Sequence, residues 1–112
     1  MTNPIRNAMN RLPGNWHKGS YTDEEGNFCG WGHIAYHMSD ERWTDGLDEM
    51  FRTDIPKITS RIAAEQFPER QSDYALETNQ PHFPSFNDHE DTTEEDVLLV
   101  LEKAAIEWEE KE

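Results

Sequence analysis

The stretch TEEDVLLVLEKAAIEW, residues 93–108, decides how the chain is expected to fold. Its apolar residues recur at intervals of three and four, which is the spacing of one face of an α-helix. That face holds Val97, Val100, Leu101, Ala104, Ala105 and Trp108. Three further apolar residues widen this face beyond that of an ordinary surface helix: Leu98, Leu99 and Ile106. We therefore predict a helix that is either central to the fold or in contact with a partner.

The start of this helix carries its own signal. Thr93 and Asp96 are three positions apart, as are the two members of a capping box, with Asp in place of the usual Glu or Gln. Four upstream helices are indicated by similar caps and periodicity. The first is expected to begin at Pro4, the second to span about residues 30–38, the third to follow Ser39 and the fourth to follow Asp54.

The predicted fold is mainly α, of the α+β kind, with four to five helices and a small N-terminal β-hairpin. The hairpin is expected because two short β-prone segments, residues 20–22 and 27–29, flank the turn-forming segment 23–26. A chain of 112 residues supports a single globular domain, residues 1–112. Within it, residues 68–92 hold three of the six prolines and are predicted to form a long irregular loop. The first and last helices are expected to pack together.

The composition limits the classes of partner. The chain has 24 acidic and 10 basic residues, giving a formal net charge of −14. Such a chain is repelled by the phosphates of nucleic acid and by anionic lipid surfaces, so neither direct nucleic-acid binding nor membrane association is expected. No apolar run is long enough to span a bilayer and no signal-peptide pattern is present, so the predicted location is the cytoplasm.

The segment CGWGHIAYH, residues 29–37, raises the question of a metal or catalytic site. Cys29, His33 and His37 follow one another at intervals of four and share one face of a helix, with residue types that suit zinc. The first and last are about 12 Å apart along the helix axis, which is far for one metal ion. A thiolate at a helix N-terminus is a second alternative.

The favoured interpretation of this segment is structural. A free cysteine is among the most buried residue types, so Cys29 is expected to pack the hairpin onto the helix. We therefore predict no catalytic residue, no metal and no cofactor, and the protein is not expected to be an enzyme. A zinc-binding or thiol-dependent protein centred on Cys29, His33 and His37 is kept as the alternative.

Two spaced patterns of residues occur in the chain. The first runs Trp, Gly, Asp-x-x-Gly, Cys and Gly, and its members here are Trp16, Gly19, Asp23, Gly26, Cys29 and Gly32. The second is an aromatic-Asn-Asp triplet followed by a Thr-led helix, here Phe86-Asn87-Asp88 and then Thr92-Thr93. Together they resemble a family of small uncharacterised proteins from actinobacteria and their bacteriophages, which usually has Trp at the position of Phe86. Residues 40–85 match the family poorly.

This resemblance implies an origin rather than an activity. The family has no function to carry over, but it implies an actinobacterial genome or a phage of such hosts. Its members usually carry a small apolar residue at the position of His33. A metal site that needs His33 would therefore not be a property of the family.

The predicted function is a small acidic interaction module that binds and modulates a host protein, itself expected to be basic. Long-range steering by carboxylates and burial of aromatic anchors would provide the binding. The residues predicted to contact the partner are Glu94, Glu95, Glu102, Trp108, Phe83 and Phe86. A third hypothesis is that the protein mimics the charge of DNA. Homodimerisation through the last helix is also left open.

Overall fold

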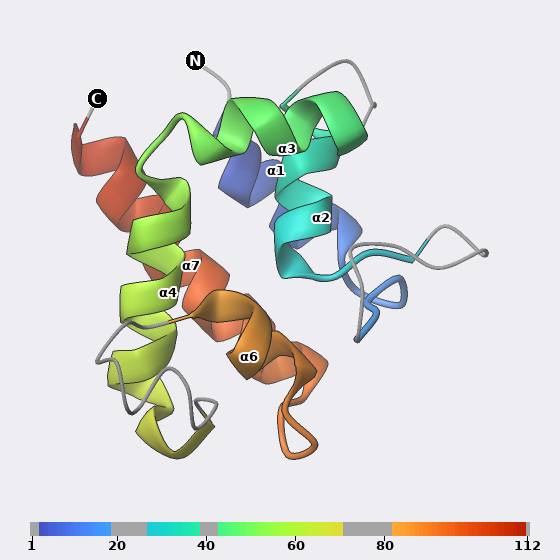
Figure 1. Ribbon diagram of the computed structural model, residues 1–112, viewed down its shortest axis with the longest axis vertical. Helices are drawn as coiled ribbons and strands as arrows, with labels where there is room; N and C mark the ends of the chain where they lie inside the picture. The colour runs from blue at the N-terminus through green and yellow to red at the C-terminus, as the bar shows by residue number, and fades with distance from the viewer. Residues whose placement is uncertain (1–2, 19–26, 39–42, 71–81, 112) are drawn as a thin grey trace.

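The computed structural model describes residues 3–18, 27–38, 43–70 and 82–111 (Figure 1). Six α-helices and one short 3₁₀-helix lie in this part of the chain, against the four to five helices that were predicted. In chain order they are α1 (Pro4–Arg11), α2 (Gly30–Tyr36), α3 (Trp43–Phe51), α4 (Ile55–Gln66), the 3₁₀-helix η1 (Pro68–Arg70), α6 (Phe83–Asp88) and α7 (Glu94–Lys111).

The predicted C-terminal helix is central, because α7 packs against both α1 and α4. Asn3, which caps α1, donates from Nδ2 to the carbonyl oxygen of Ala105 at 3.2 Å. Beyond the other end of α1, the backbone N–H of Gly14 donates to the Glu94 carboxylate at 2.7 Å. The start of α1 thus meets the end of α7, so the two helices are antiparallel and the expected packing of first and last helices is confirmed.

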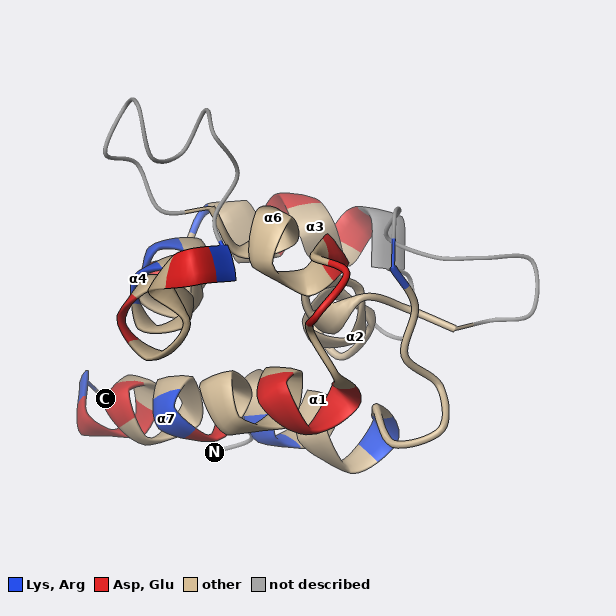
Figure 2. Cartoon of the chain, turned by 90° about the horizontal axis from the view of Figure 1, so that it is seen from below, with Lys and Arg blue, Asp and Glu red and all other residues tan. Residues whose placement is uncertain are grey.

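Helix α4 is also antiparallel to α7 and packs on a different face of it from α1. Three ion pairs link α7 to α4, to the residue before α4 and to η1. They join Asp54 to Lys111, Arg61 to Glu107 and Arg70 to Asp96, so the partner on α7 moves toward its N-terminus as the chain runs along α4. Figure 2 shows the resulting arrangement, with α1 and α7 in one layer and α2, α4 and α6 lying over it. Helix α3 packs on the far side of α2.

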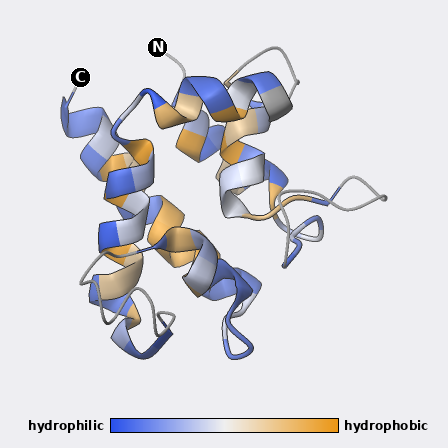
Figure 3. Ribbon diagram, in the orientation of Figure 1, coloured by the Kyte–Doolittle hydropathy of each residue, from blue (hydrophilic) through white to orange (hydrophobic). Residues whose placement is uncertain are grey.

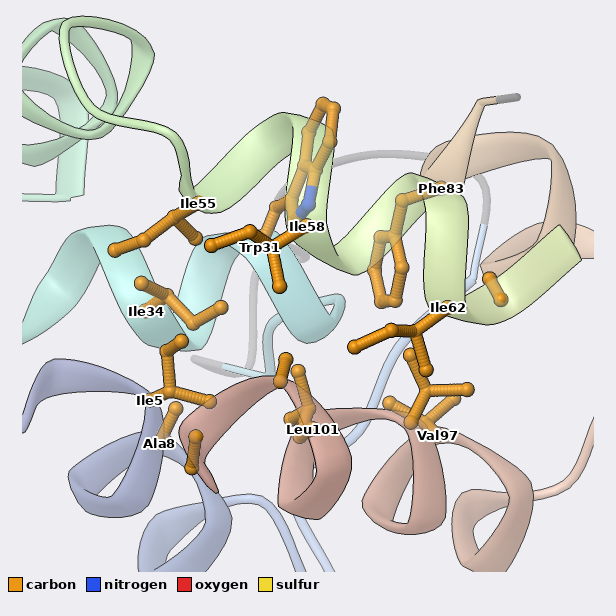
Figure 4. Close-up of a cluster of buried hydrophobic side chains, with 14 of the residues drawn as sticks. Ile5, Ala8, Trp31, Ile34, Ile55, Ile58, Ile62, Phe83, Val97 and Leu101 are labelled. Carbon is orange, nitrogen blue, oxygen red and sulfur yellow. The ribbon is translucent and has the colours of Figure 1, made fainter. Parts of the chain in front are cut away.

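The core lies between these layers. The face of α7 that was predicted to be buried is fully buried at Val97, Val100, Leu101, Ala104 and Ala105. Figure 4 shows how this face meets side chains from the other helices, among them Ile5, Ala8, Ile34, Ile58, Ile62 and Phe83. The most hydrophobic segments of the ribbon accordingly gather where helices meet (Figure 3).

The caps explain where the helices begin. The backbone N–H of Asp96 donates to the Thr93 hydroxyl at 3.3 Å, and the Thr93 N–H donates to the Asp96 carboxylate at 3.1 Å. This reciprocal pair confirms the predicted capping box of α7. Asp54 stands at the N-cap of α4 as predicted, but its side chain makes no capping bond. The capping hydrogen bond comes from Thr53 instead, whose hydroxyl accepts from the backbone N–H of Ile55 at 3.1 Å.

The predicted N-terminal β-hairpin is wrong. Its first segment, residues 20–22, lies outside the described residues. In its second segment, Phe28 forms an isolated parallel bridge with Trp16, through backbone hydrogen bonds of 2.9 and 3.0 Å. This bridge cannot grow into a strand because Cys29, the next residue, is already the N-cap of α2. The chain is mainly α, and no β-strand occurs in the ranges that the structure describes.

A helix also lies within the segment 68–92, which was predicted to be an irregular loop. Helix α6 places Pro84 in its first turn, where proline is well tolerated. Phe83 and Phe86 of this helix are fully buried. The backbone N–H of Phe83 donates to the Ser60 hydroxyl of α4 at 3.0 Å. Residues 71–81 of the predicted loop lie outside the described part of the chain.

The contact between α2 and α3 depends on a glycine. A Cβ atom at Gly46 would lie 1.7 Å from the carbonyl oxygen of Ala35, a backbone atom that cannot move aside. We predict that Gly46→Ala lowers the free energy of unfolding by about 2 kcal/mol or more, because overpacking outweighs the gain in helix propensity. Urea unfolding followed by circular dichroism measures this, with the exposed Glu49→Ala as control. A Gly46→Ala protein as stable as the wild type would contradict it.

Candidate functional site

Cys29 is a buried capping residue. It stands at the N-cap of α2, and its Sγ accepts a hydrogen bond from the backbone N–H of Gly32 at 3.3 Å. The side chain is 6% exposed. Burial raises the pKa of the thiol to about 11, although the Gly32 N–H acts in the opposite direction. The thiol is therefore protonated at neutral pH, and a thiolate nucleophile is not what this environment favours.

His33 is fully buried and fastens α2 to the segment after α1. Its Nε2 lies 3.0 Å from the carbonyl oxygen of Asn15. A carbonyl only accepts hydrogen bonds, so Nε2 carries the hydrogen and donates it. The ring also meets the edge of Phe28, at 5.4 Å between centroids. Burial lowers the pKa of His33 to about 4, so the imidazole is neutral at physiological pH.

These contacts bear on the metal alternative. His33 directs Nε2 to Asn15, Cys29 directs its sulfur to Gly32, and His37 lies at the C-cap of α2 with its ring against Tyr36. No three His, Cys, Asp or Glu side chains in the described ranges are placed to hold one metal ion. Nothing in the described structure supports the metal-binding alternative.

Asn87 of α6 is a buried polar residue that links three segments, whereas the sequence identified it only as a member of the aromatic-Asn-Asp triplet. Its Oδ1 accepts from Trp16 Nε1 at 2.8 Å and from the backbone N–H of Gly30 at 3.1 Å. Its Nδ2 donates to the carbonyl oxygen of His17 at 3.1 Å and to Asp88 Oδ1 at 3.0 Å. All four hydrogen bonds that an amide side chain can form are thus made. The amide joins α6, the start of α2 and the segment after α1.

A second polar contact fixes α2 on α4. Trp31 is 5% exposed, and its Nε1 donates to the Thr59 hydroxyl at 2.9 Å. The hydroxyl donates in turn to the carbonyl oxygen of Ile55 at 2.8 Å. The indole also stacks on Phe83, with 5.6 Å between ring centroids. Trp31 therefore belongs to the core and is not a surface anchor.

The residues predicted to contact a partner fall into two groups. Phe83 and Phe86 are fully buried and stabilise the core, so their rings are not available to a partner in this conformation. Glu94 is half-buried and accepts the hydrogen bond from Gly14. Trp108 is half-buried against the core, and its enclosed Nε1 donates to no described residue.

The remaining two, Glu95 and Glu102, lie on a surface that we call the outer face of α7. This face consists of Glu95, Leu99, Glu102 and Ile106, which all are exposed. Its two apolar residues, Leu99 and Ile106, are 39% and 45% exposed. Beside them a shallow depression of about 440 Å³ is lined by Met9, Asn10, Glu95, Leu98, Leu99 and Glu102. Acidic residues recur along the whole of α7 (Figure 2).

Comparison with known proteins assigns a family. The model described as "Family of unknown function (DUF6197)" matches residues 5–107. The chain belongs to DUF6197. The match to DUF6197 supports the resemblance to a family without known function, while the actinobacterial or phage origin and the two motifs stay predictions. No curated protein matches the chain, and no solved structure matches it. None of the helices in the described ranges is long and apolar enough to cross a membrane.

We predict that Asn87→Ala lowers the free energy of unfolding of this DUF6197 protein by about 2–4 kcal/mol. The substitution leaves the donors of Trp16 and Gly30 without an acceptor in a buried environment, and such groups cost about 1–3 kcal/mol each. Denaturant unfolding measures the effect. The exposed Asn10→Ala, as a matched control, changes stability by less than about 0.5 kcal/mol. Equal stability of the two variants would show that the Asn87 network does not hold the fold.

A pH dependence follows from His33. Its pKa of about 4 in the folded chain is below the ordinary value of 6.5, so the unfolded chain binds the proton first. The stability that His33 contributes is complete above pH 6.5 and is lost as the pH falls from 6.5 toward 4. His33→Gln, which keeps a donor for Asn15, should flatten the stability curve between pH 6.5 and 5, where most carboxylates do not titrate. Unchanged curvature in the variant would exclude this assignment.

Proposed function

We propose that this protein is a small acidic, non-enzymatic interaction module that binds a basic amphipathic segment of a host protein through the outer face of α7. Bound there, it modulates the host protein by covering that segment. The observation that carries the proposal is the exposure of Leu99 and Ile106, two turns apart on one helix, where they alternate with the carboxylates of Glu95 and Glu102.

The spacing of this face suits a helical or extended partner. Positions 95, 99, 102 and 106 follow one another at intervals of four, three and four, which places them in one stripe along α7. Two apolar anchors separated by two turns are the arrangement by which an amphipathic helix is recognised. A partner with apolar residues at matching positions would bury both anchors.

The charge of the face selects a basic partner. Glu95 and Glu102 form no hydrogen bond or ion pair with any described residue. Other carboxylates of α7 are engaged within the chain, namely Glu94 with Gly14, Asp96 with Arg70, Glu107 with Arg61 and Glu109 with Arg6. Glu95 and Glu102 are exposed, so lysine or arginine of a partner can reach both carboxylates, although Glu102 also interacts electrostatically with Arg6. The net charge of −14 steers such a partner from a distance.

The proposed role is non-enzymatic and cytoplasmic. The buried thiol of Cys29 and the buried imidazole of His33, which were the strongest candidates for chemistry, act as packing and capping groups. An unpaired cysteine suits a reducing compartment. The resemblance to proteins of actinobacteria and their phages supports a host of that kind, so the partner is sought in an actinobacterial lysate.

The test compares a double variant of the outer face of α7 with a control variant on another surface, both made by replacing exposed apolar residues with arginine. Leu99→Arg combined with Ile106→Arg removes both anchors and neutralises the formal charge of the outer face, whereas Phe51→Arg changes a 50% exposed apolar residue on α3. We expect the wild type to retain a basic protein in a salt-sensitive manner and the double variant to retain at least about 10-fold less. Circular dichroism checks that each variant is folded.

Several outcomes would contradict the proposal. Equal retention by the wild type and the double variant would place the interaction elsewhere, and loss in the Phe51 control would point to a general effect of added charge. Displacement of the partner by duplex DNA would favour the DNA-charge mimic instead. Light scattering that shows a concentration-dependent dimer, lost in the double variant, would assign the outer face of α7 to a second copy of the chain.

A further inference from the structure

Arg11, at the end of α1, is half-buried, whereas Arg52, which also forms no ion pair with a described residue, is exposed. Arg6, Arg61 and Arg70 each form an ion pair with a carboxylate. The guanidinium of Arg11 makes no hydrogen bond or ion pair with any described residue, and its enclosed Nη1 donates to none of them. The chain has 24 acidic and 10 basic residues, so a carboxylate partner would be expected for a half-buried cation. Arg11 has none among the described residues.

Aromatic rings hold this guanidinium in place. Its Cζ lies 3.5 Å from the ring centroid of Tyr36 and 5.0 Å from that of Phe28. Cation–π contacts of this kind fix the position of the charge without neutralising it. An arginine that is already ordered loses little further conformational entropy when it binds an anion.

The guanidinium lines a depression of about 580 Å³ whose other walls are also rich in hydrogen-bond donors. The described residues that line it are Asn7, Asn10, Arg11, Tyr36 and His37. None of these five carries a carboxylate, and each side chain can offer an N–H or O–H group. Asn7 and Arg11 are four positions apart on α1 and Asn7 and Asn10 are three apart, so their side chains lie on one side of the helix.

We propose that this depression binds an oxyanion, the carboxylate or phosphate group of a small ligand, between the guanidinium of Arg11 and the side-chain amides of Asn7 and Asn10. The planar guanidinium offers paired donors to two oxygen atoms, which is the geometry that carboxylates and phosphates share. The amides supply neutral donors beside it. Asn10 also lines the depression beside the outer face of α7, so the two sites are neighbours. They differ in the charge of the ligand, because this site takes an anion and the outer face takes a basic segment.

The experiment is a titration of the full chain with sodium phosphate and with sodium acetate, followed by ¹⁵N-resolved NMR. Sodium chloride keeps the ionic strength constant, so that screening does not change during the titration. We expect saturable shifts of the backbone amides of Asn7, Asn10 and Arg11. A stronger response to phosphate assigns a phosphate ligand, and a stronger response to acetate assigns a carboxylate. Shifts that do not saturate with either anion would overturn the proposal.

Variants decide whether Arg11 is responsible. Arg11→Gln should weaken binding of the responding anion by at least about 10-fold. Asn10→Asp, at an exposed position, adds a carboxylate to the depression and should weaken binding to a similar degree even if Arg11→Gln does not fold. The exposed Arg52→Gln is the matched control and keeps wild-type affinity. Wild-type affinity in Asn10→Asp would overturn the proposal, whereas the Leu99 and Ile106 variant should bind the anion normally.

Discussion

The side chain of Asn87 is the constraint on which the rest of the structure depends. Three segments far apart in sequence meet at one buried amide: the bridge region at Trp16, the first residue of α2 and helix α6. A buried amide is stable only when its donors and acceptors are all used, and here all four are. The geometry of this group therefore specifies where α2 begins and how α6 lies on it, which apolar packing alone would leave less defined.

The interior and the surface have different chemical character. Groups that could react or titrate inside the molecule, the thiol of Cys29 and the imidazole of His33, are neutral and engaged with the backbone of Gly32 and Asn15. Charges without an ion-pair partner among the described residues line surface depressions, as the carboxylates of Glu95 and Glu102 on the outer face of α7 and as the half-buried guanidinium of Arg11 beside α2. Recognition of partners, through surfaces of opposite charge, is the chemistry that this distribution favours.

Local signals in the sequence were sufficient for the central helix and insufficient for the contacts around it. The period of α7 and the Thr93–Asp96 capping box are properties of neighbouring residues, so both could be predicted. The bridge between Trp16 and Phe28 could not be predicted, because tertiary packing decides which segment pairs with Phe28. The β-prone residues around it are equally consistent with a hairpin. Helix α6 was missed because Pro84 was counted as a loop signal, although its first-turn position favours a helix.

The candidate site shows the same limit. The exposed carboxylates of Glu95 and Glu102 were predicted from helical periodicity, but Phe83 and Phe86 were taken for anchors because burial of an aromatic residue cannot be read from a segment that looks irregular. The role of Asn87 had one available signal, its place in the aromatic-Asn-Asp triplet. That signal indicates a turn as readily as a network, since Asn serves in both.

The antiparallel packing of α1 against α7 has a consequence for the synthesis of the protein. Asn3 is separated by 102 residues from Ala105, to which it donates, and Gly14 by 80 residues from Glu94. A ribosome that adds about 5–20 residues per second delivers the partner of the first helix about 5–20 s after that helix. During this interval the apolar stripe of Ile5, Ala8 and Leu12 has no α7 to cover it. The nascent chain thus completes this core only after α7 has been synthesised, and the strongly negative charge that it accumulates meanwhile helps to keep it from aggregating.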